Sequence, residues 1–378
     1  MLSTNRIAII LGAMFLSLGA FDGMLGVLWP TLRGEMGRDI GDLGYLLAAY
    51  LIASMAGSLL SSWALKHWGI RHGLKGSTVI AVVGAICVAL APTWHWLLAA
   101  GVVRGLGNGA IHAYLNTYAA RALSNRKTMV IHGMWGGGAA AAAFTMTLLV
   151  SSGIAWQWNL LWCVVPALFA FAGYYTLPRV VDTDRGQTLS ALKRGDWIAV
   201  IAGGTYVAVE ASVGNWAYTL MTQGWSMSIE VAGMATSVFW ILITVGRISL
   251  AGLPLSAAWW LKLMPWMLAG SAGLLFVGQH QLWFGIAALW AVGLSASVIF
   301  PSLIYQAITN AQPATKPKIA GAILTCAAAG GASGPAAIGW LASAGALLWI
   351  PLPIAALGVV SALCARQVAL RGSPASDS

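Results

Sequence analysis

Long apolar runs alternate with short polar connections along almost the whole chain. Six runs fall in the first half, at residues 7–32, 41–65, 75–93, 95–120, 129–152 and 158–178. Six more follow, at residues 197–222, 229–253, 258–278, 281–308, 317–342 and 345–367. A helix of about 20 apolar residues crosses the hydrocarbon core of a bilayer. The pattern therefore predicts twelve membrane-spanning helices rather than the short alternating strands of an outer-membrane barrel.

The longest hydrophilic connection divides these spans six and six. We expect an all-α polytopic membrane protein with an N-terminal six-helix bundle at residues 1–178 and a C-terminal six-helix bundle at 197–368. A cytoplasmic central loop at 179–196 would join the bundles, and residues 369–378 would form a cytoplasmic tail. Two halves of six spans are the layout of secondary transporters that are built from repeats.

The composition excludes a soluble enzyme. The chain is 59% hydrophobic and only 8% charged, whereas a soluble domain averages about 25% charged residues. No GxxxxGK[ST] phosphate loop, HExxH or HxxxH motif occurs, so we expect no ATP-driven step, no metal, no cofactor and no enzymatic activity. The four cysteines lie in apolar runs without a CxxC pair, which indicates free thiols.

The net charge of +10 indicates topology rather than a nucleic-acid partner. If both termini are cytoplasmic, all of the 20 Lys and Arg residues except Arg33, Arg38 and Arg104 lie in or beside cytoplasmic connections. This asymmetry is the positive-inside rule. The first run lacks a small-residue cleavage site, so we interpret it as a retained span. We expect a multi-pass protein of a bacterial inner membrane, or an equivalent membrane, that acts as a monomer among lipids.

Two sequence stretches resemble the major facilitator superfamily. The loop after the second span reads SWALKHWGIR, in which Gly69 and Arg71 match the family pattern Gly-x-x-x-Asp-Arg-x-Gly-Arg-Arg, while Lys66 and His67 replace Asp-Arg. The fourth span reads RGLGNGAIHAYLNTYAA, which resembles the family's Arg-x-x-x-Gly motif. It also resembles the fucose-permease-like branch at Asn116. The resemblance implies the major facilitator fold and a transport function.

Milder resemblances to the same branch surround the stretches HGMWGGGAAAAA and WILITVGR, which carry His132 and Arg247. We take Gly69, Arg71, His132 and Arg247 as candidates for gating or conformational roles. An interfacial position would explain His132 equally well. Snorkelling of a long side chain toward the membrane surface would explain Arg247.

Five ionisable residues lie within the predicted spans, namely Asp22, Arg104, His112, His132 and Glu210. Even on lenient scales a charged side chain at the bilayer centre costs about 2.5–3.5 kcal/mol, so such groups usually line a wet passage or pair with each other. Asp22 and Glu210 occupy equivalent spans of the two halves. We therefore expect Asp22, Glu210 and His112 to couple protons. The alternative for Asp22 is an acid that caps a glycine kink.

A polar stripe runs along the fourth span, because Arg104, Asn108, His112 and Asn116 recur every four residues. We expect this face to contact the solute, although Arg104 could instead brace helices by binding carbonyl groups. Other candidate contacts lie deep in the first, seventh and tenth spans: Trp29, Tyr206, Asn215, Trp216, Ser295, Ser297 and Tyr305. Core filling is an alternative for the deep tryptophans.

These features predict a proton-coupled secondary transporter that moves a small polar organic solute, such as a sugar, by alternating access. Two other functions stay open. A proton-driven exporter of amphipathic or drug-like compounds would also use deep aromatic side chains. A membrane receptor or assembly partner that no longer transports would fit the altered loop around Lys66 and His67.

Overall fold

The computed structural model of the chain describes residues 3–178, 192–250, 253, 255–312 and 315–371. Secondary structure in these residues is helical. The N-terminal helices are α1 (Thr4–Glu35), α2 (Asp42–Ala89), α3 (Trp94–Ala122), α4 (Asn125–Ser151), η1 (Trp156–Leu160) and α5 (Leu161–Gly173). The C-terminal helices are α6 (Arg194–Thr219), η2 (Leu220–Gly224), α7 (Ile229–Leu250), α8 (Ala257–Leu274), η3 (Leu275–Gln279), α9 (Leu282–Asn310), α10 (Lys316–Ser343), η5 (Leu347–Trp349) and α11 (Pro351–Arg371).

The second helix, α2, contains two of the predicted spans. Its residues Asp42–Leu65 and His67–Ala89 are each long and apolar enough to cross a membrane. Near the start of the second segment, Gly69 has φ 72° and ψ 164°, a left-handed conformation that only glycine adopts at little cost. Both arms contact α3, since the backbone of Gly105 approaches Tyr50 and that of Gly107 approaches Ala81. The chain therefore reverses at this kink, and α2 is a hairpin.

Eleven helical segments of the described chain are long and apolar enough to cross a membrane. They correspond to eleven of the twelve predicted spans, and α3 supplies the other. This helix falls short in hydropathy because Arg104, Asn108, His112 and Asn116 interrupt its apolar residues. The all-α prediction is confirmed. Most of the predicted connection at 179–196, which contains Arg179 and Arg185, lies outside the described residues. The same holds for most of the predicted tail at 369–378. The bounds of both segments stay predictions.

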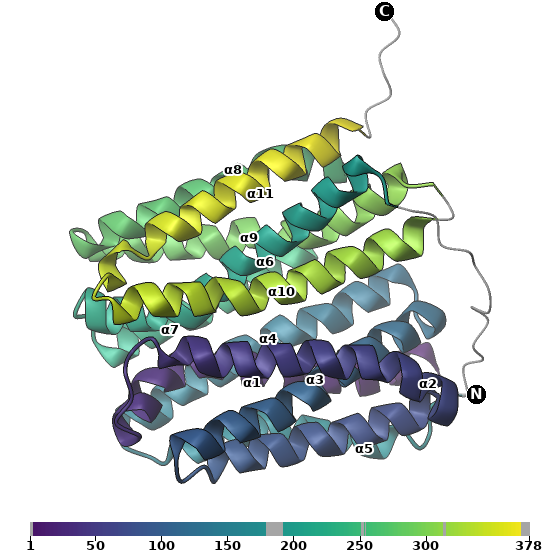
Figure 1. Cartoon of the computed structure of the whole chain (residues 1–378), viewed down its shortest axis with the longest axis horizontal. Helices are drawn as coiled ribbons and strands as arrows, with labels where there is room; N and C mark the ends of the chain where they lie inside the picture. Colours follow the sequence, from purple (N-terminus) through teal and green to yellow (C-terminus); the bar gives the residue numbers. More distant parts are fainter. Residues whose placement is uncertain (1–2, 179–191, 251–252, 254, 313–314, 372–378) are drawn as a thin grey trace, which may run out of the picture.

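The helices form two groups that lie side by side (Figure 1). Helices α1 to α5 occupy the lower part of the view, in purple and blue, and α6 to α11 the upper part, in teal to yellow. Three pairs of helices join the groups: α4 packs on α7, α2 on α10 and α1 on α6. The start of α1 and the end of α11 lie at the same end of the molecule, which we call the end with the termini.

The end of the molecule away from the termini is closed by backbone contact between the two groups. A Cβ atom on Gly26 of α1 would lie 2.8 Å from the carbonyl oxygen of Gly214 in α6. A Cβ atom on Gly44 of α2 would lie 3.0 Å from the Cα of Ala336 in α10. Arg33 also donates a hydrogen bond to Oε1 of Gln223 at 3.0 Å. Toward the termini, the ribbons of α1 and α10 diverge (Figure 1).

Candidate functional site

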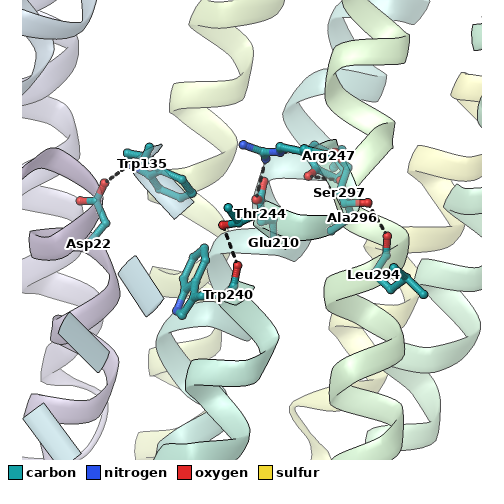
Figure 2. A network of polar contacts seen from close by, with 10 residues as sticks. Asp22, Trp135, Glu210, Trp240, Thr244, Arg247, Leu294, Ala296 and Ser297 are labelled. Atoms are coloured by element: carbon teal, nitrogen blue, oxygen red, sulfur yellow. Dashed lines mark hydrogen bonds and ion pairs between the residues drawn. The ribbon is translucent and has the colours of Figure 1, made fainter. Parts of the chain in front are cut away.

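Asp22 lies midway along α1, and its carboxylate is held from two other helices. Oδ1 accepts a hydrogen bond from the Tyr50 hydroxyl of α2 at 3.0 Å. Oδ2 accepts one from the Trp135 indole Nε1 of α4 at 3.1 Å, as Figure 2 shows. Close packing makes this possible, because the backbone of α4 at Trp135 lies where any side chain at Gly19 would be. Each carboxylate oxygen thus has one neutral donor.

Arg104 of α3 is buried beside this carboxylate, with 1% of its surface exposed. Its Cζ atom lies 4.6 Å from the centre of the Phe21 ring, a cation–π arrangement. The charges of Arg104 and Asp22 interact, yet no ion pair or hydrogen bond joins the two in the described residues. The Arg104 Nε and Nη2 atoms are buried and have no hydrogen-bond partner. No bond to a described carbonyl group supports the bracing role.

The rest of the polar stripe on α3 continues away from Asp22. Asn108 is 5% exposed, and its Nδ2 donates to Oγ of Ser54 at 3.4 Å while its Oδ1 is buried without a partner. His112 and His132 both pack on Phe15, with ring centres 5.8 Å and 4.6 Å away. Asn116 is half-buried. Polar groups therefore line this face of α3, as predicted from the spacing.

Glu210 of α6 forms an ion pair with Arg247 of α7. The Arg247 Nη2 lies 3.3 Å from Oε1 of Glu210, and its Nε donates to the carbonyl oxygen of Ser297 at 3.3 Å (Figure 2). The exposed fractions of the two side chains are 19% for Arg247 and 9% for Glu210. The snorkelling interpretation of Arg247 is therefore wrong: the side chain turns inward because a buried carboxylate offers it a charged partner.

Tyr206 lies one turn before Glu210 and is fully buried. Its hydroxyl donates to the carbonyl oxygen of Ala296 at 2.8 Å, and its ring stacks on Phe300. Tyr206 and Arg247 thus both bind backbone carbonyls of α9. The acid of the second half is held by a neighbouring cation, whereas Asp22 in the first half is held by neutral donors.

Two tryptophan rings from α4 and α7 lie at the interface between the two acids. The rings of Trp135 and Trp240 meet edge to face, with centres 5.3 Å apart. Figure 2 shows both rings between Asp22 and the Glu210–Arg247 pair. Charges interact from His112 to Arg104 and His132, and from His132 to Arg247. The five predicted intramembrane ionisable residues and Arg247 therefore lie near one another along this interface, and we call these six residues the polar row.

The structure places three predicted solute contacts at or near the closed end instead. Trp29 donates from Nε1 to the carbonyl oxygen of Ile40 at 2.7 Å and packs on Trp94. Trp216 donates to the carbonyl oxygen of Pro335 at 3.0 Å, and this bond joins α6 to α10. Asn215 lies beside Gly26, where the two groups meet. Its Oδ1 is buried without a hydrogen-bond partner.

The three candidates in α9 also differ from expectation. The hydroxyls of Ser295 and Ser297 are buried and donate to carbonyl oxygens of their own helix, each at 2.7 Å. Ser297 nevertheless takes part in the row through its backbone carbonyl, which binds Arg247. Tyr305 is 62% exposed and lies outside the row. A helical hydroxyl can bond to the preceding turn, so serine alone does not mark a solute contact.

The described contacts of the loop motif are made within the N-terminal half of the molecule. Gly69 provides the kink of α2, and the Arg71 guanidinium donates to the carbonyl oxygen of Leu177. His67 is exposed and bonds to the carbonyl of Trp63, while the side chain of Lys66 lies outside the described residues. No described contact ties this segment to the second half, so its predicted gating role stays a prediction.

The sequence gives no sign that Tyr50 is one of the two donors to Asp22. It lies in the apolar stretch LLAAYLIAS, where no spacing relates it to an acid 28 residues earlier. No spacing in the sequence relates Trp135 or Trp240 to the two acids either. Their contact across the interface depends on how α4 and α7 pack, which hydropathy does not encode.

A buried polar row between two groups of membrane-spanning helices is typical of multi-pass membrane transporters. Residues 10–257 match the family model of the Major Facilitator Superfamily. The chain belongs to the Major Facilitator Superfamily. The fold agrees, since the nucleoside transporter NupG superimposes with a TM-score of 0.75 at 13% sequence identity, covering 96% of this chain and 99% of that one.

Two relatives illustrate the sequence similarity. The cyanate transport protein CynX of Escherichia coli is 30% identical over 201 residues, which are 48% of this chain and 50% of that protein. The match thus spans about half the length of that relative. An uncharacterized MFS-type transporter of Yersinia pestis is 26% identical over 327 residues, or 85% of each chain.

Proposed function

We propose that the protein is a proton-coupled secondary transporter that moves a small polar organic solute by alternating access. It would lie in a bacterial inner membrane with both termini in the cytoplasm. The solute would bind between the two groups of helices, beside Asp22, Arg104 and the Glu210–Arg247 pair. Asp22 and Glu210 would exchange protons as the solute enters and leaves.

The observation that carries this proposal is the pair of membrane-embedded acids, one in each half, on either side of the same interface. An acid in the bilayer is costly unless it serves a passage or a proton relay. Tyr50 can either donate to or accept from Asp22, whereas the Trp135 indole only donates. Asp22 can therefore hold or release a proton without losing both of its partners. Glu210 instead loses its ion pair with Arg247 when it takes up a proton and forms the pair again when it releases the proton.

The closed end supports alternating access. Glycine contacts at Gly26 and Gly44 seal one end of the molecule, while α1 and α10 diverge toward the termini (Figure 1). If the termini are cytoplasmic, the sealed end faces the outside in this conformation. Small residues at the seam allow helices of the two halves to meet and separate with little rearrangement of side chains.

The names of the relatives do not fix the solute. Cyanate and nucleosides are the cargoes that the names of two similar proteins give, and these differ in size and charge. The polar row itself favours a solute with several hydrogen-bonding groups. It offers a free guanidinium at Arg104 and an unpartnered amide oxygen at Asn108.

The test has two stages. A thermal-shift screen of purified protein against sugars, organic acids, amino acids and drugs identifies a ligand, because binding to the folded state raises the melting temperature. Proteoliposomes with a pH gradient then report uptake of that ligand and the accompanying proton flux.

The variants Asp22→Asn and Glu210→Gln are expected to bind the ligand but to lose accumulation up its gradient. Glu230→Gln removes an exposed acid at the start of α7 and serves as the matched control with normal uptake. Accumulation driven by the pH gradient in the Asp22→Asn, Glu210→Gln double variant contradicts the proposal.

A further inference from the structure

We propose that the Arg104 guanidinium binds the carboxylate of a monoanionic solute, and that this carboxylate and a proton on Asp22 travel together without net charge. The inference rests on the proposed transport function and names its substrate class. Its basis is an unpaired fork of donors, the groups around it and the balance of charge in the row.

The first observation is one unpaired edge of the Arg104 guanidinium, which we call the fork. Nε and Nη2 of Arg104 lie on one edge of the guanidinium plane, and both are buried without a hydrogen-bond partner. That edge presents two parallel N–H groups at the spacing of the two oxygens of a carboxylate. Buried donors are nearly always paired, and an unpaired pair on a cation is costly. The edge is therefore complementary to a planar anion that the described residues do not provide.

The surroundings of the fork separate it from the nearest acid. Phe21 covers the guanidinium, with 4.6 Å between Cζ and the ring centre. Both oxygens of Asp22 are already bonded, to Tyr50 and Trp135. Asp22 thus influences Arg104 through its charge rather than by occupying the fork. In the described conformation protein encloses the fork, so an anion reaches it when the side chains around it, Phe21 among them, move.

Among the charged groups of the row, Arg104 is the cation whose balance depends on the protonation of Asp22. Arg247 is paired with Glu210. The groups that face Asp22 are Tyr50 from α2, Arg104 from α3, Trp135 from α4 and Cys163 from α5, and Arg104 is the cation among them.

When Asp22 is ionised, its charge offsets Arg104 and repels an incoming anion. When Asp22 is protonated, Arg104 carries an excess positive charge that one carboxylate neutralises. Binding of the anion therefore requires a proton on Asp22, and one proton accompanies each monoanion.

The first experiment measures binding to the purified full-length protein without any gradient. Melting temperature and tryptophan fluorescence are followed during titration with sodium propionate and sodium benzoate, and with the neutral propionamide and benzamide. The carboxylates are expected to bind and the amides not. Binding is expected to be tighter at about pH 5.5 than at about pH 7.5, because protonation and anion binding are linked. Equal binding of acids and amides, or of neither, overturns the inference.

Variants assign the effect to the fork. Arg104→Lys keeps the charge but loses the two parallel donors, and is expected to weaken carboxylate binding about tenfold. Asp22→Asn is expected to bind carboxylate with the same affinity at both pH values. Arg366→Gln removes an exposed arginine of α11 and is the matched control. Unchanged binding in Arg104→Lys together with unchanged pH dependence in Asp22→Asn contradicts the inference, even if Arg104→Gln does not fold.

A flux measurement separates this inference from the proposed function. In proteoliposomes, uptake of a binding carboxylate is expected to follow the pH gradient and to be unaffected by a potassium diffusion potential. Proton-driven uptake of neutral solutes only would overturn the carboxylate site and leave the transport function intact. Carboxylate binding without proton-coupled flux would overturn the transport function and leave the site intact.

Discussion

At the scale of single residues, the two acids are held in different ways. Asp22 has neutral donors from α2 and α4, and Glu210 has the cation Arg247. Both acids could be recognised as candidate functional residues from the sequence, because an acid in an apolar run is costly. It could not predict Tyr50, because the partner of a buried group depends on which helices pack together. The same reason explains why the sequence did not predict that Arg247 pairs with Glu210.

The hydrogen bond from Tyr50 to Asp22 should be measurable as stability. Tyr50→Phe leaves the ring in place and removes the donor to Oδ1. A loss of about 1 kcal/mol in the free energy of unfolding is expected, the usual contribution of such a bond. Chemical denaturation in detergent measures it. Tyr305→Phe removes an exposed hydroxyl and should leave stability unchanged, and an equal loss in both variants would contradict the assigned role.

The ion pair between Glu210 and Arg247 predicts a stronger effect with a specific rescue. Glu210→Gln leaves a mostly buried guanidinium without its charged partner, so a loss on the order of 3 kcal/mol is expected. Replacing Arg247 by Met in the same variant removes the unpaired charge and should restore part of the stability. A double-mutant cycle from denaturation curves gives the coupling energy. Additive effects of the two substitutions would show that the pair contributes nothing.

At the scale of elements, hydropathy located the spans well because apolar length is a direct physical requirement of the bilayer. The ends and kinks of the helices were harder to predict from hydropathy. The third predicted span, 75–93, begins earlier in the structure, directly after the Gly69 kink, since the polar residues before position 75 are already helical. The stripe on α3 was predictable from its spacing, but the position of Arg104 beside Asp22 required the packing of α3 against the α2 hairpin.

The kink gives a test at this scale. Gly69→Ala places a Cβ atom on a residue with φ 72°, and a loss of about 1–2 kcal/mol in stability is expected from the left-handed conformation alone. Nothing lies within 4 Å of a Cβ atom at this position, so a steric clash does not contribute. Gly76→Ala, in the helical arm with equally open surroundings, should be neutral or slightly stabilising. Melting temperatures of the two variants provide the comparison.

At the scale of the whole molecule, two helical groups meet at a closed end and separate toward the termini. The resemblance to the major facilitator superfamily predicted this fold, and the family match confirms the membership. The pattern of apolar runs could not show which end is closed, because both conformations of a transporter share one sequence. The answer came from glycines whose neighbours leave no space for a side chain.

Closure can be tested through Gly26. Gly26→Leu adds a side chain where the backbone of α6 lies within 3 Å, so the closed end should not form. Transport is expected to fall strongly. A cysteine introduced at Gln223 should react faster with a membrane-impermeant maleimide. Gly34→Leu, on the same helix with nothing within 4 Å of its Cβ position, should change neither. Equal labelling rates in the Gly26 and Gly34 variants would contradict the assignment of the seal.

The polarity of α3 also bears on how the chain enters the membrane during synthesis. A segment that carries Arg104 and is less apolar than its neighbours partitions poorly from the translocation channel into lipid on its own. The two arms of α2 are made first, and they offer α3 a protein surface through Tyr50 and Ala81. We therefore expect α2 and α3 to enter the membrane together. Substitutions in the hairpin that prevent this association should cause retention and degradation of the nascent protein.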